Sequence, residues 1–300
     1  MAQLTGAYVS INDLVRLTSA HGKVRRRKRK ARKLSGDRFS RQRGRGVDFE
    51  EVRLYQPGDD VRNIDWNVTA RKNEPHTKVF TEEREKPTLV VVDQTASMFF
   101  GSKLRLKSVV AAEIAARLAW VTLAQHDRVG GVVFGEEGTI TTKPLRNSRS
   151  VVKLLRTVAM ANQALRVNKI GPSKEDLWDS MITHLRNAAP HHHRIIVISD
   201  FKNIGQKAIQ ELMHRGRHNE LQVFHVYDEL ETILPPSNQY SVTTRTDTIE
   251  FDSSGNTTRR EYERRFEIRL DRLKTACVQN LVAFESFSTT ENLDFLSLER

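Results

Sequence analysis

A carboxylate and two hydroxyl side chains occupy alternate positions directly after the first apolar run of the chain. Asp93, Thr95 and Ser97 follow residues 88–92, whose apolar and β-branched side chains predict a buried strand. Ligands in open α/β sheets bind outside the carboxyl ends of the strands. Mg²⁺ prefers such oxygen donors, keeps several waters and uses few carboxylates. The spacing therefore predicts a site for Mg²⁺ or another divalent cation, which an Asp or Glu of a partner protein completes.

A second carboxylate ends a later apolar run. Asp200 follows residues 194–199, and adjacent parallel strands would bring it close to Asp93. The competing interpretation is that both aspartates cap the following helices while the hydroxyls complete a turn, because a helix start also needs oxygen acceptors. The residues by themselves leave the two interpretations open.

The elements that must position these residues follow from the hydrophobic pattern. Between residues 88 and 228, short apolar runs alternate with longer amphipathic stretches, which is typical of parallel strands joined by helical crossovers. We expect strands at 88–93, 129–134, 194–199, 221–227 and 280–287, helices at 103–124, 150–160, 175–188, 207–217 and 257–277, and hairpin-like alternation at 139–142 and 240–251. Together they predict an α/β fold with a doubly wound, mainly parallel sheet flanked by helices.

Residues 46–87 differ in character and predict a small β element. Residues 46–55 and 76–83 read as strands, separated by a turn at 57–60 and a polar stretch. The acids between 48 and 65 do not follow the alternating spacing of an EF-hand loop, so ion pairing is favoured over a calcium site. The expected basic partners of these acids are Arg53, Arg62, Arg71 and Arg84.

The net charge of +12 comes from one short segment. Thirteen of the 49 Lys and Arg residues lie between residues 23 and 45 with one of the 37 acids, which leaves 36 residues of each sign elsewhere. This basic arm follows a weakly amphipathic segment at 4–17, which suits peripheral membrane contact or a helix docked on the domain equally. We therefore divide the chain into an accessory part at 1–45, the β element at 46–87 and a main domain at 88–300.

The basic arm supports an alternative function, association with nucleic acid or with an anionic membrane surface. Its expected polyanion-binding residues are Arg25, Arg26, Arg27, Lys28, Arg29, Lys30, Arg32 and Lys33. The arm holds one aromatic residue, Phe39, so a base-stacking platform is not indicated. An acidic partner surface would attract the same charges, and a solvated tether is the interpretation that needs no ligand.

Cysteine usage and hydropathy limit the cellular compartment. The single cysteine, Cys277, excludes an intramolecular disulfide framework and fits a reducing compartment. No apolar run approaches the roughly 20 residues that span a bilayer, and the first residues lack the apolar core of a signal peptide. We therefore expect a cytoplasmic protein, peripheral to the membrane if the arm or the segment at 4–17 binds lipid.

Enzyme motifs are missing or incomplete in the sequence. Neither a Gly-x-x-x-x-Gly-Lys-Ser/Thr phosphate loop nor a Gly-x-Ser-x-Gly nucleophile elbow occurs. Thr95 stands where a haloacid-dehalogenase-type phosphatase needs a second acid, and Cys277 lies in an amphipathic stretch that favours a packed thiol. The histidine tract at 191–193 favours a solvated loop over a metal site. We expect no enzymatic activity, and a phosphate-ester enzyme ranks behind both binding functions.

Two resemblances extend this interpretation. Asp93-x-Thr95-x-Ser97 resembles the metal-ion-dependent adhesion site of von Willebrand factor A domains, Asp-x-Ser-x-Ser, and Asp200 is similar to that fold's late metal-proximal aspartate. A wider resemblance, over roughly residues 44–295, is to the bacterial domain of unknown function 58 family. It is carried by Gly46-Val-Asp-Phe-Glu, Arg53-Leu-Tyr-Gln-Pro-Gly-Asp-Asp-Val-Arg62, Ile64-Asp65-Trp66, Ala70-Arg71, Glu83-Arg84, Ser97-Met98…Phe100-Gly101 and Tyr227-Asp228-Glu229-Leu230-Glu231…Leu234-Pro235.

The resemblance implies a von Willebrand factor A-like domain that acts with a MoxR-type AAA+ ATPase, or with its client, in chaperone-like assembly or maturation. Thr95 departs from the usual Ser but keeps the hydroxyl. A third site position, a Thr in adhesion-type domains, should fall at 171–176, where Ser173 would supply a hydroxyl and direct spacing points to Glu175. We therefore expect a non-enzymatic, metal-dependent protein-interaction module without a small-molecule substrate.

Overall fold

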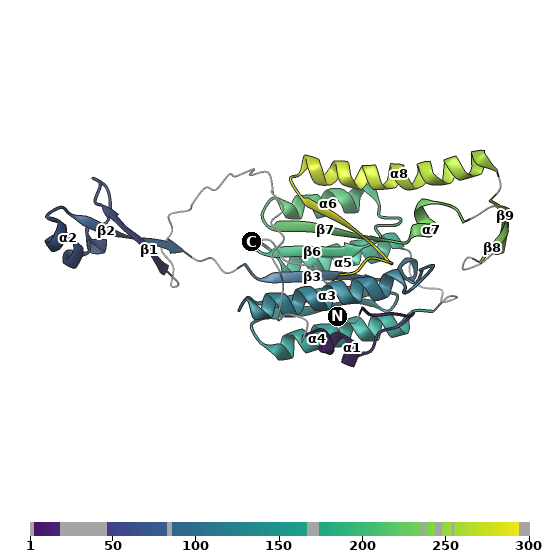
Figure 1. The fold of residues 1–300 in the computed structure, drawn as a ribbon, viewed down its shortest axis with the longest axis horizontal. Coiled ribbons are helices and arrows are strands. Elements are labelled where there is room, and N and C mark those ends of the chain that lie inside the picture. The colour runs from purple at the N-terminus through teal and green to yellow at the C-terminus, as the bar shows by residue number, and fades with distance from the viewer. Residues whose placement is uncertain are drawn as a thin grey trace. The chain divides into compact units, whose positions relative to one another are not determined.

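The computed structural model describes residues 3–18, 47–82, 86–166, 174–235, 238–243, 248–253 and 255–293. The chain forms two units, a larger one from Met1–Arg27 with Lys86–Arg300 and a smaller one from Lys28–Glu85 (Figure 1). The basic arm at 23–45 lies outside the described residues.

The larger unit is built on a six-stranded sheet in the order β10-β7-β6-β3-β4-β5. The pairs β10–β7, β7–β6, β6–β3 and β3–β4 are parallel, and only the edge pair β4–β5 is antiparallel. The strands are β3 (Thr88–Gln94), β4 (Val129–Gly135), β5 (Gly138–Leu145), β6 (Arg194–Ser199), β7 (Glu220–Tyr227) and β10 (Ala283–Ser288). This confirms the doubly wound α/β fold, and all five predicted strands of the sheet are present.

Helices cover both faces of this sheet, as Figure 1 shows for α3 and α4 on one side and α6 and α8 on the other. Successive strand residues point to opposite faces, so Val90 and Val92 pack in one core while Leu89 and Val91 pack in the other. The helices of the larger unit are α1 (Ile11–Arg16), α3 (Lys107–Ala124), α4 (Ser148–Ala164), α5 (Lys174–Ala188), α6 (Gln206–Gly216), α7 (Glu229–Thr232) and α8 (Asn256–Gln279), with the 3₁₀ turn η3 (Ala96–Met98). A further hairpin pairs β8 (Gln239–Thr243) with β9 (Thr248–Asp252), where the alternation at 240–251 predicts it.

Glycine in β4 allows close packing of the neighbouring helix. A Cβ on Gly131 would lie 2.5 Å from the carbonyl oxygen of Val90 and 2.6 Å from a methyl group of Leu154 in α4. Such distances are far inside van der Waals contact, so any side chain there would push α4 away from the sheet. Gly131 thus serves helix packing, while a Cβ on its neighbour Gly130 would meet the backbone of β5, 2.4 Å from the carbonyl oxygen of Thr142.

The amphipathic segment before the basic arm belongs to the larger unit. Ser10 and Asp13 form a capping box at the start of α1, and Leu14 of this helix is fully buried. The indole Nε1 of Trp120 donates to the carbonyl oxygen of Leu14 at 3.1 Å. Of the two interpretations of the segment at 4–17, the structure has the docked helix, because the apolar face of residues 3–18 is buried in the core that contains α3.

The smaller unit contains the predicted β element. Strands β1 (Val47–Leu54) and β2 (His76–Glu82) pair antiparallel, and between them lie η2 (Val61–Asn63) and α2 (Trp66–Lys72). Asp60 caps η2 and Asp65 caps α2 by accepting backbone N–H groups. The expected ion pairing is present for Arg53, which contacts Asp59 at 2.7 Å. Arg84 lies outside the described residues.

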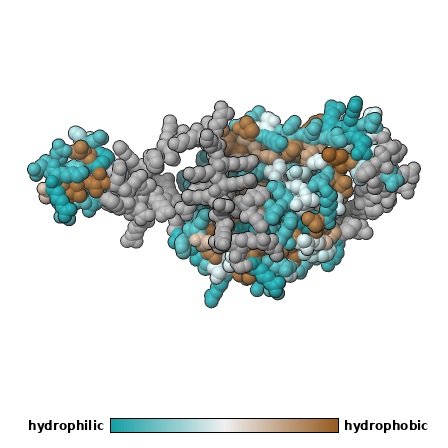
Figure 2. All heavy atoms as spheres, viewed as in Figure 1, coloured by the Kyte–Doolittle hydropathy of each residue, from teal (hydrophilic) through white to brown (hydrophobic). Residues whose placement is uncertain are grey.

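Exposed apolar residues lie in separate patches among hydrophilic ones on the face that Figure 2 shows. Isolated apolar side chains on a surface are normal for a folded protein. None of the described helices combines the length and the apolar character needed to cross a bilayer.

One buried ion cluster joins the two ends of the larger unit. Glu113 in α3 pairs with Arg105 and, at 2.7 Å, with Arg117, and it also accepts the backbone N–H of Leu4. Arg105 in turn donates to the backbone carbonyl oxygens of Thr289 and Glu291. We predict that Glu113→Ala lowers the free energy of unfolding by about 3–5 kcal/mol, because it leaves two buried guanidinium groups without their shared carboxylate.

Chemical denaturation of the full chain measures this loss. The matched control is Glu261→Ala on α8, where Glu261 pairs with the exposed Arg265 at 2.9 Å. The control should change the free energy of unfolding by less than about 1 kcal/mol, as is usual for surface pairs. Equal effects of the two substitutions would show that the buried cluster adds nothing beyond a surface pair.

Candidate functional site

Strands β3 and β6 lie side by side at the point where the winding of the sheet changes direction. From β3 the chain proceeds to β4 and β5 on one side, and from β6 to β7 and β10 on the other. Their parallel register pairs Val92 with Ile198, so the next residues, Asp93 and Ser199, lie at the same level. This switch point at the carboxyl ends of the strands is where open α/β sheets bind ligands.

Asp93 is fully buried at the end of β3. One carboxylate oxygen accepts the backbone N–H of Thr95 at 2.8 Å, and the other accepts the hydroxyl of Ser199 at 2.5 Å. The Ser199 hydroxyl also accepts the backbone N–H of Phe201 at 2.9 Å. Asp93 therefore ties the turn after β3 to the turn after β6 and fixes both relative to the sheet.

The two hydroxyls after Asp93 face each other in this turn. Thr95 Oγ1 and Ser97 Oγ are 3.3 Å apart; Thr95 is buried and Ser97 is partly exposed. The backbone N–H of Ala96 donates to Glu136 at 2.8 Å, which fastens the turn to the β4–β5 connection. The turn thus presents one accessible hydroxyl backed by a second one.

Asp200 binds a lysine that the sequence interpretation did not include. The ammonium group of Lys107 lies 2.8 Å from Asp200 and 2.7 Å from Glu231, and it is fully buried. The other oxygen of Asp200 accepts the backbone N–H of Lys202 at 2.9 Å. The aromatic ring of Phe100 lies 5.9 Å from the same ammonium group. Lys107 therefore supplies a fixed positive charge beside the end of β6.

The charge of Lys107 persists despite its burial. Burial opposes an ammonium ion, but the two carboxylates outweigh that effect and raise the pKa of Lys107 above its ordinary value. Removing Lys107, or both carboxylates, would leave an uncompensated buried charge. The three side chains come from α3, the end of β6 and α7, so the cluster fixes these elements together.

Some of the residues predicted to bind a divalent cation have suitable surroundings in the structure, and one does not. Asp93, Thr95 and Ser97 fit as ligands, because carboxylate and hydroxyl oxygens accept more than one contact and lie within one turn. Asp200 fits poorly because Lys107 already neutralises it. In the part of the chain that the structure describes, no three His, Cys, Asp or Glu side chains gather to hold a metal by themselves. The hydroxyls would thus be essential ligands.

The remaining predicted site residues are distributed as follows. Ser173 lies outside the described residues, and Glu175 is an exposed residue in the first turn of α5. The competing interpretation, in which the two aspartates cap helices and the hydroxyls complete a turn, holds in part. Asp93 and Asp200 each accept the backbone N–H group two residues further along the chain, as in a turn. The N-cap of α6, however, is Gly205 and not Asp200. Cys277 is buried, and burial raises the pKa of its thiol to about 11, as expected of a packed thiol.

Sequence reasoning missed three residues that shape this site: Lys107, Ser199 and Glu136. The one available signal was a lysine inside an apolar stretch, since Lys107 stands between Leu106 and Val109 at the start of a helix that is otherwise buried. Lysine is seldom fully buried unless it is paired. That rule predicts a carboxylate partner without saying which one.

We predict that Lys107→Met destabilises the protein by about 3–5 kcal/mol, because Asp200 and Glu231 lose their common cation while the side-chain volume is kept. Chemical denaturation measures the loss. Lys103→Met is the matched control, since Lys103 pairs with Glu229 at 2.5 Å on the exposed surface, and its effect should be much smaller. A Lys107→Met protein as stable as this control would contradict the role of the buried cluster.

His225 on β7 gives a second prediction, on pH. Burial, reinforced by Lys107 and other cations and opposed by Asp200, lowers the pKa of His225 from 6.5 to about 4. Between these pH values the unfolded chain binds a proton that the native chain does not, so stability is lost as pH falls. Between pH 7 and pH 5 this residue should cost about 2 kcal/mol. His225→Phe should remove that part of the pH dependence in denaturation experiments, and an unchanged dependence would contradict it.

Known proteins similar to this chain include curated relatives without an assigned function. Uncharacterized proteins Rv1480 of Mycobacterium tuberculosis and Mb1516 of Mycobacterium bovis are each 38% identical over 132 residues, which is 44% of this chain. The chain spans 41% of the length of these relatives. The similarity therefore covers a part of each protein.

Solved structures align with this chain at low sequence identity, and one protein family matches most of it. BatB from Bacteroides thetaiotaomicron aligns over 68% of this chain and 90% of its own, with 13% identity and a TM-score of 0.42. The VWA domain of SpRpn10 aligns over 71% and 93%, with 10% identity and a TM-score of 0.37. Likenesses at this level say nothing about function. Residues 51–269, most of the chain, match the family described as "Protein of unknown function DUF58", and the chain belongs to that family.

Proposed function

We propose that this protein is a non-enzymatic protein-interaction module that binds its partner at the carboxyl ends of β3 and β6. The observation that carries the proposal is the Thr95–Ser97 hydroxyl pair, held in one turn beside Asp93 at the switch point of the sheet. Asp93, Ser199 and Glu136 fix that turn before any partner arrives. A preformed polar contact loses little conformational entropy on binding.

The surroundings of the turn support contact with a protein. The loop that follows η3 exposes Phe100 and Leu104, with 41% and 51% of their surfaces accessible. Exposed aromatic and aliphatic side chains beside a polar group are typical of protein interfaces. The edge around β3 therefore combines an apolar anchor with directed hydrogen-bonding groups.

Metal dependence is part of the proposal. Asp93, Thr95 and Ser97 would hold the ion, with Asp200 left to Lys107. A bound Mg²⁺ would offer an open coordination position to a carboxylate of the partner. The partner that the family resemblance favours is a MoxR-type AAA+ ATPase or its client, and the corresponding location is the cytoplasm.

The basic arm favours a second candidate function, because a net charge of +12 is concentrated in residues 23–45 of an otherwise neutral chain. Such a segment would bind RNA, DNA or an anionic membrane surface, with affinity that falls steeply as salt increases. Salt-independent retention on RNA or anionic vesicles would exclude this function.

The test of the first function is capture of a MoxR-type AAA+ ATPase from the same organism by the full chain. Thr95→Val and Ser97→Ala remove one hydroxyl each, and each should weaken binding about tenfold in Mg²⁺ buffer, as loss of a charge-assisted contact does. Chelation of Mg²⁺ should weaken it similarly. The matched control is Ser180→Ala, which removes a hydroxyl on α5 that contacts Thr139 at 3.1 Å.

Two further variants rank the candidate functions. Asp93→Ala should abolish capture of the ATPase. The basic arm is tested by Lys/Arg→Gln changes at residues 25–33, because deletion of residues 1–45 would also remove α1. If the arm variant loses the ATPase and the hydroxyl variants retain it, the module function is wrong. Retention of binding by the arm variant supports it.

A further inference from the structure

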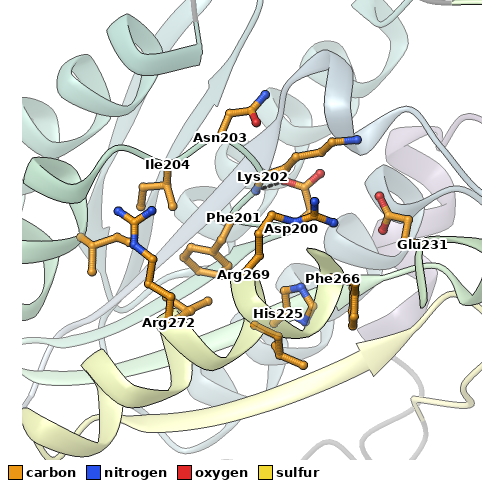
Figure 3. Close-up of a pocket in the computed structure, with 13 residues that line it drawn as sticks. Asp200, Phe201, Lys202, Asn203, Ile204, His225, Glu231, Phe266, Arg269 and Arg272 are labelled. Atoms are coloured by element: carbon orange, nitrogen blue, oxygen red, sulfur yellow. Dashed lines mark hydrogen bonds between the residues drawn. The ribbon is translucent and has the colours of Figure 1, made fainter. Parts of the chain in front are cut away.

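A pocket of about 200 Å³ lies beside Asp200, between the carboxyl ends of β6 and β7 and the helices α6 and α8. Its charged and titratable lining residues are Asp200, Lys202, His225, Glu231, Arg269 and Arg272 (Figure 3). Phe266 and Leu273 of α8 contribute apolar walls. The dashed line in Figure 3 is the bond from the backbone N–H of Lys202 to Asp200, which holds the loop at the rim.

The two carboxylates of the pocket share one buried cation behind it. Lys107 lies within 2.8 Å of both Asp200 and Glu231 and is fully buried. Its charge offsets one of the two negative charges, and the three cationic side chains of the lining outnumber the other. The acidic residues therefore do not make this a cation site.

Two cationic side chains of the lining form no ion pair within 4 Å with a carboxylate of the described residues. Lys202 makes no side-chain ion pair within 4 Å, and the guanidinium group of Arg269 contacts only the ring of Phe266, at 6.0 Å from its centre. Arg272 donates to Gln206, a neutral side chain. With Lys107 included, four cations face two carboxylates, so the pocket keeps an excess of positive charge.

The pKa of Lys202 is consistent with this excess of positive charge. Desolvation, reinforced by Lys107 and Arg269 and opposed by Glu231 and Asp200, lowers the pKa of Lys202 below its ordinary value, and a bound anion would stabilise its charged form. His225 stays uncharged near neutral pH and stacks between Tyr227 and Phe284, at 5.7 and 6.2 Å between ring centres. It forms a neutral, rigid floor.

The size of the pocket limits what binds. Sites for drug-sized ligands occupy about 300–1,000 Å³, so about 200 Å³ suits one small group rather than a nucleotide or a cofactor. Carboxylate and phosphate groups are the natural ligands of a paired lysine and arginine.

We propose that this pocket binds a small oxyanion group through Lys202 and Arg269, and that the group is a carboxylate side chain of a protein partner. Anion binding follows from the pocket alone. The assignment to a partner's side chain rests on the proposed function, since the pocket opens at the same edge of the sheet as the Thr95–Ser97 turn, and Asp200 directly follows Ser199, which donates to Asp93.

The test is an NMR titration of the full chain with isotope-labelled histidines, because His225 lines the pocket and reports on it directly. The probes are inorganic phosphate and a short glutamate-rich peptide, each at constant ionic strength. His225→Phe identifies the resonance among the ten histidines. Both probes should shift the His225 signal saturably.

Lys202→Gln and Arg269→Gln should each weaken this response about tenfold, as expected when one charge-assisted hydrogen bond is lost. The matched control is Arg265→Gln, which removes one charge from the same helix at a residue paired with Glu261. It should leave the response unchanged. No saturable shift with either probe, or equal weakening by Arg265→Gln, would overturn the anion site.

The two probes separate the sources of the anion. Binding of phosphate without binding of the peptide would overturn the assignment to a partner's side chain. Thr95→Val should leave the His225 response intact. If the unmodified chain fails to capture the ATPase while its His225 signal still shifts with the probes, the proposed function alone is contradicted. If the unmodified chain captures the ATPase but neither probe shifts its His225 signal, the anion site in the pocket alone is contradicted.

Discussion

The buried ammonium group of Lys107 is the interaction on which the functional edge of this protein depends. It joins α3, the end of β6 and α7 through contacts of 2.8 and 2.7 Å with Asp200 and Glu231. A buried charge without a partner costs several kcal/mol, so none of the three groups is tolerable alone. The loops at the carboxyl ends of the strands are thereby fixed by electrostatics as well as by packing.

A second ion cluster lies close by in the chain and secures the same helix. Arg105, directly before α3, and Glu113 within it bind the backbone near both ends of the larger unit, at Leu4 and at Thr289. The helix is buried along most of its length, with alanines that allow close packing against the sheet. The edge of the sheet therefore has a rigid base, which suits a surface that recognises a partner without rearranging.

This arrangement places two different chemistries at one edge. The turn after β3 offers hydroxyls backed by the buried carboxylate of Asp93, and the pocket beside Asp200 offers Lys202 and Arg269. Lys107 separates them, because it pairs with Asp200 and Glu231, which would otherwise make the pocket attract cations. A carboxylate-bearing partner would meet complementary charge at the pocket, and at the turn through a bound cation.

Hydrophobic periodicity, read from the sequence, predicted the strands, the helices and the order in which they alternate, since these depend on side chains a few residues apart. It also placed Asp93, Thr95, Ser97 and Asp200 at strand ends, because a strand end is a local feature. The pairing of Lys107 with groups 93 and 124 residues away could not be predicted in this way. Periodicity carries no information on which distant charges meet, and the same limit hid the anion pocket and the docking of residues 3–18. Only the tertiary structure decided those, because burial turns a distant charge pair from a weak surface contact into an obligatory one.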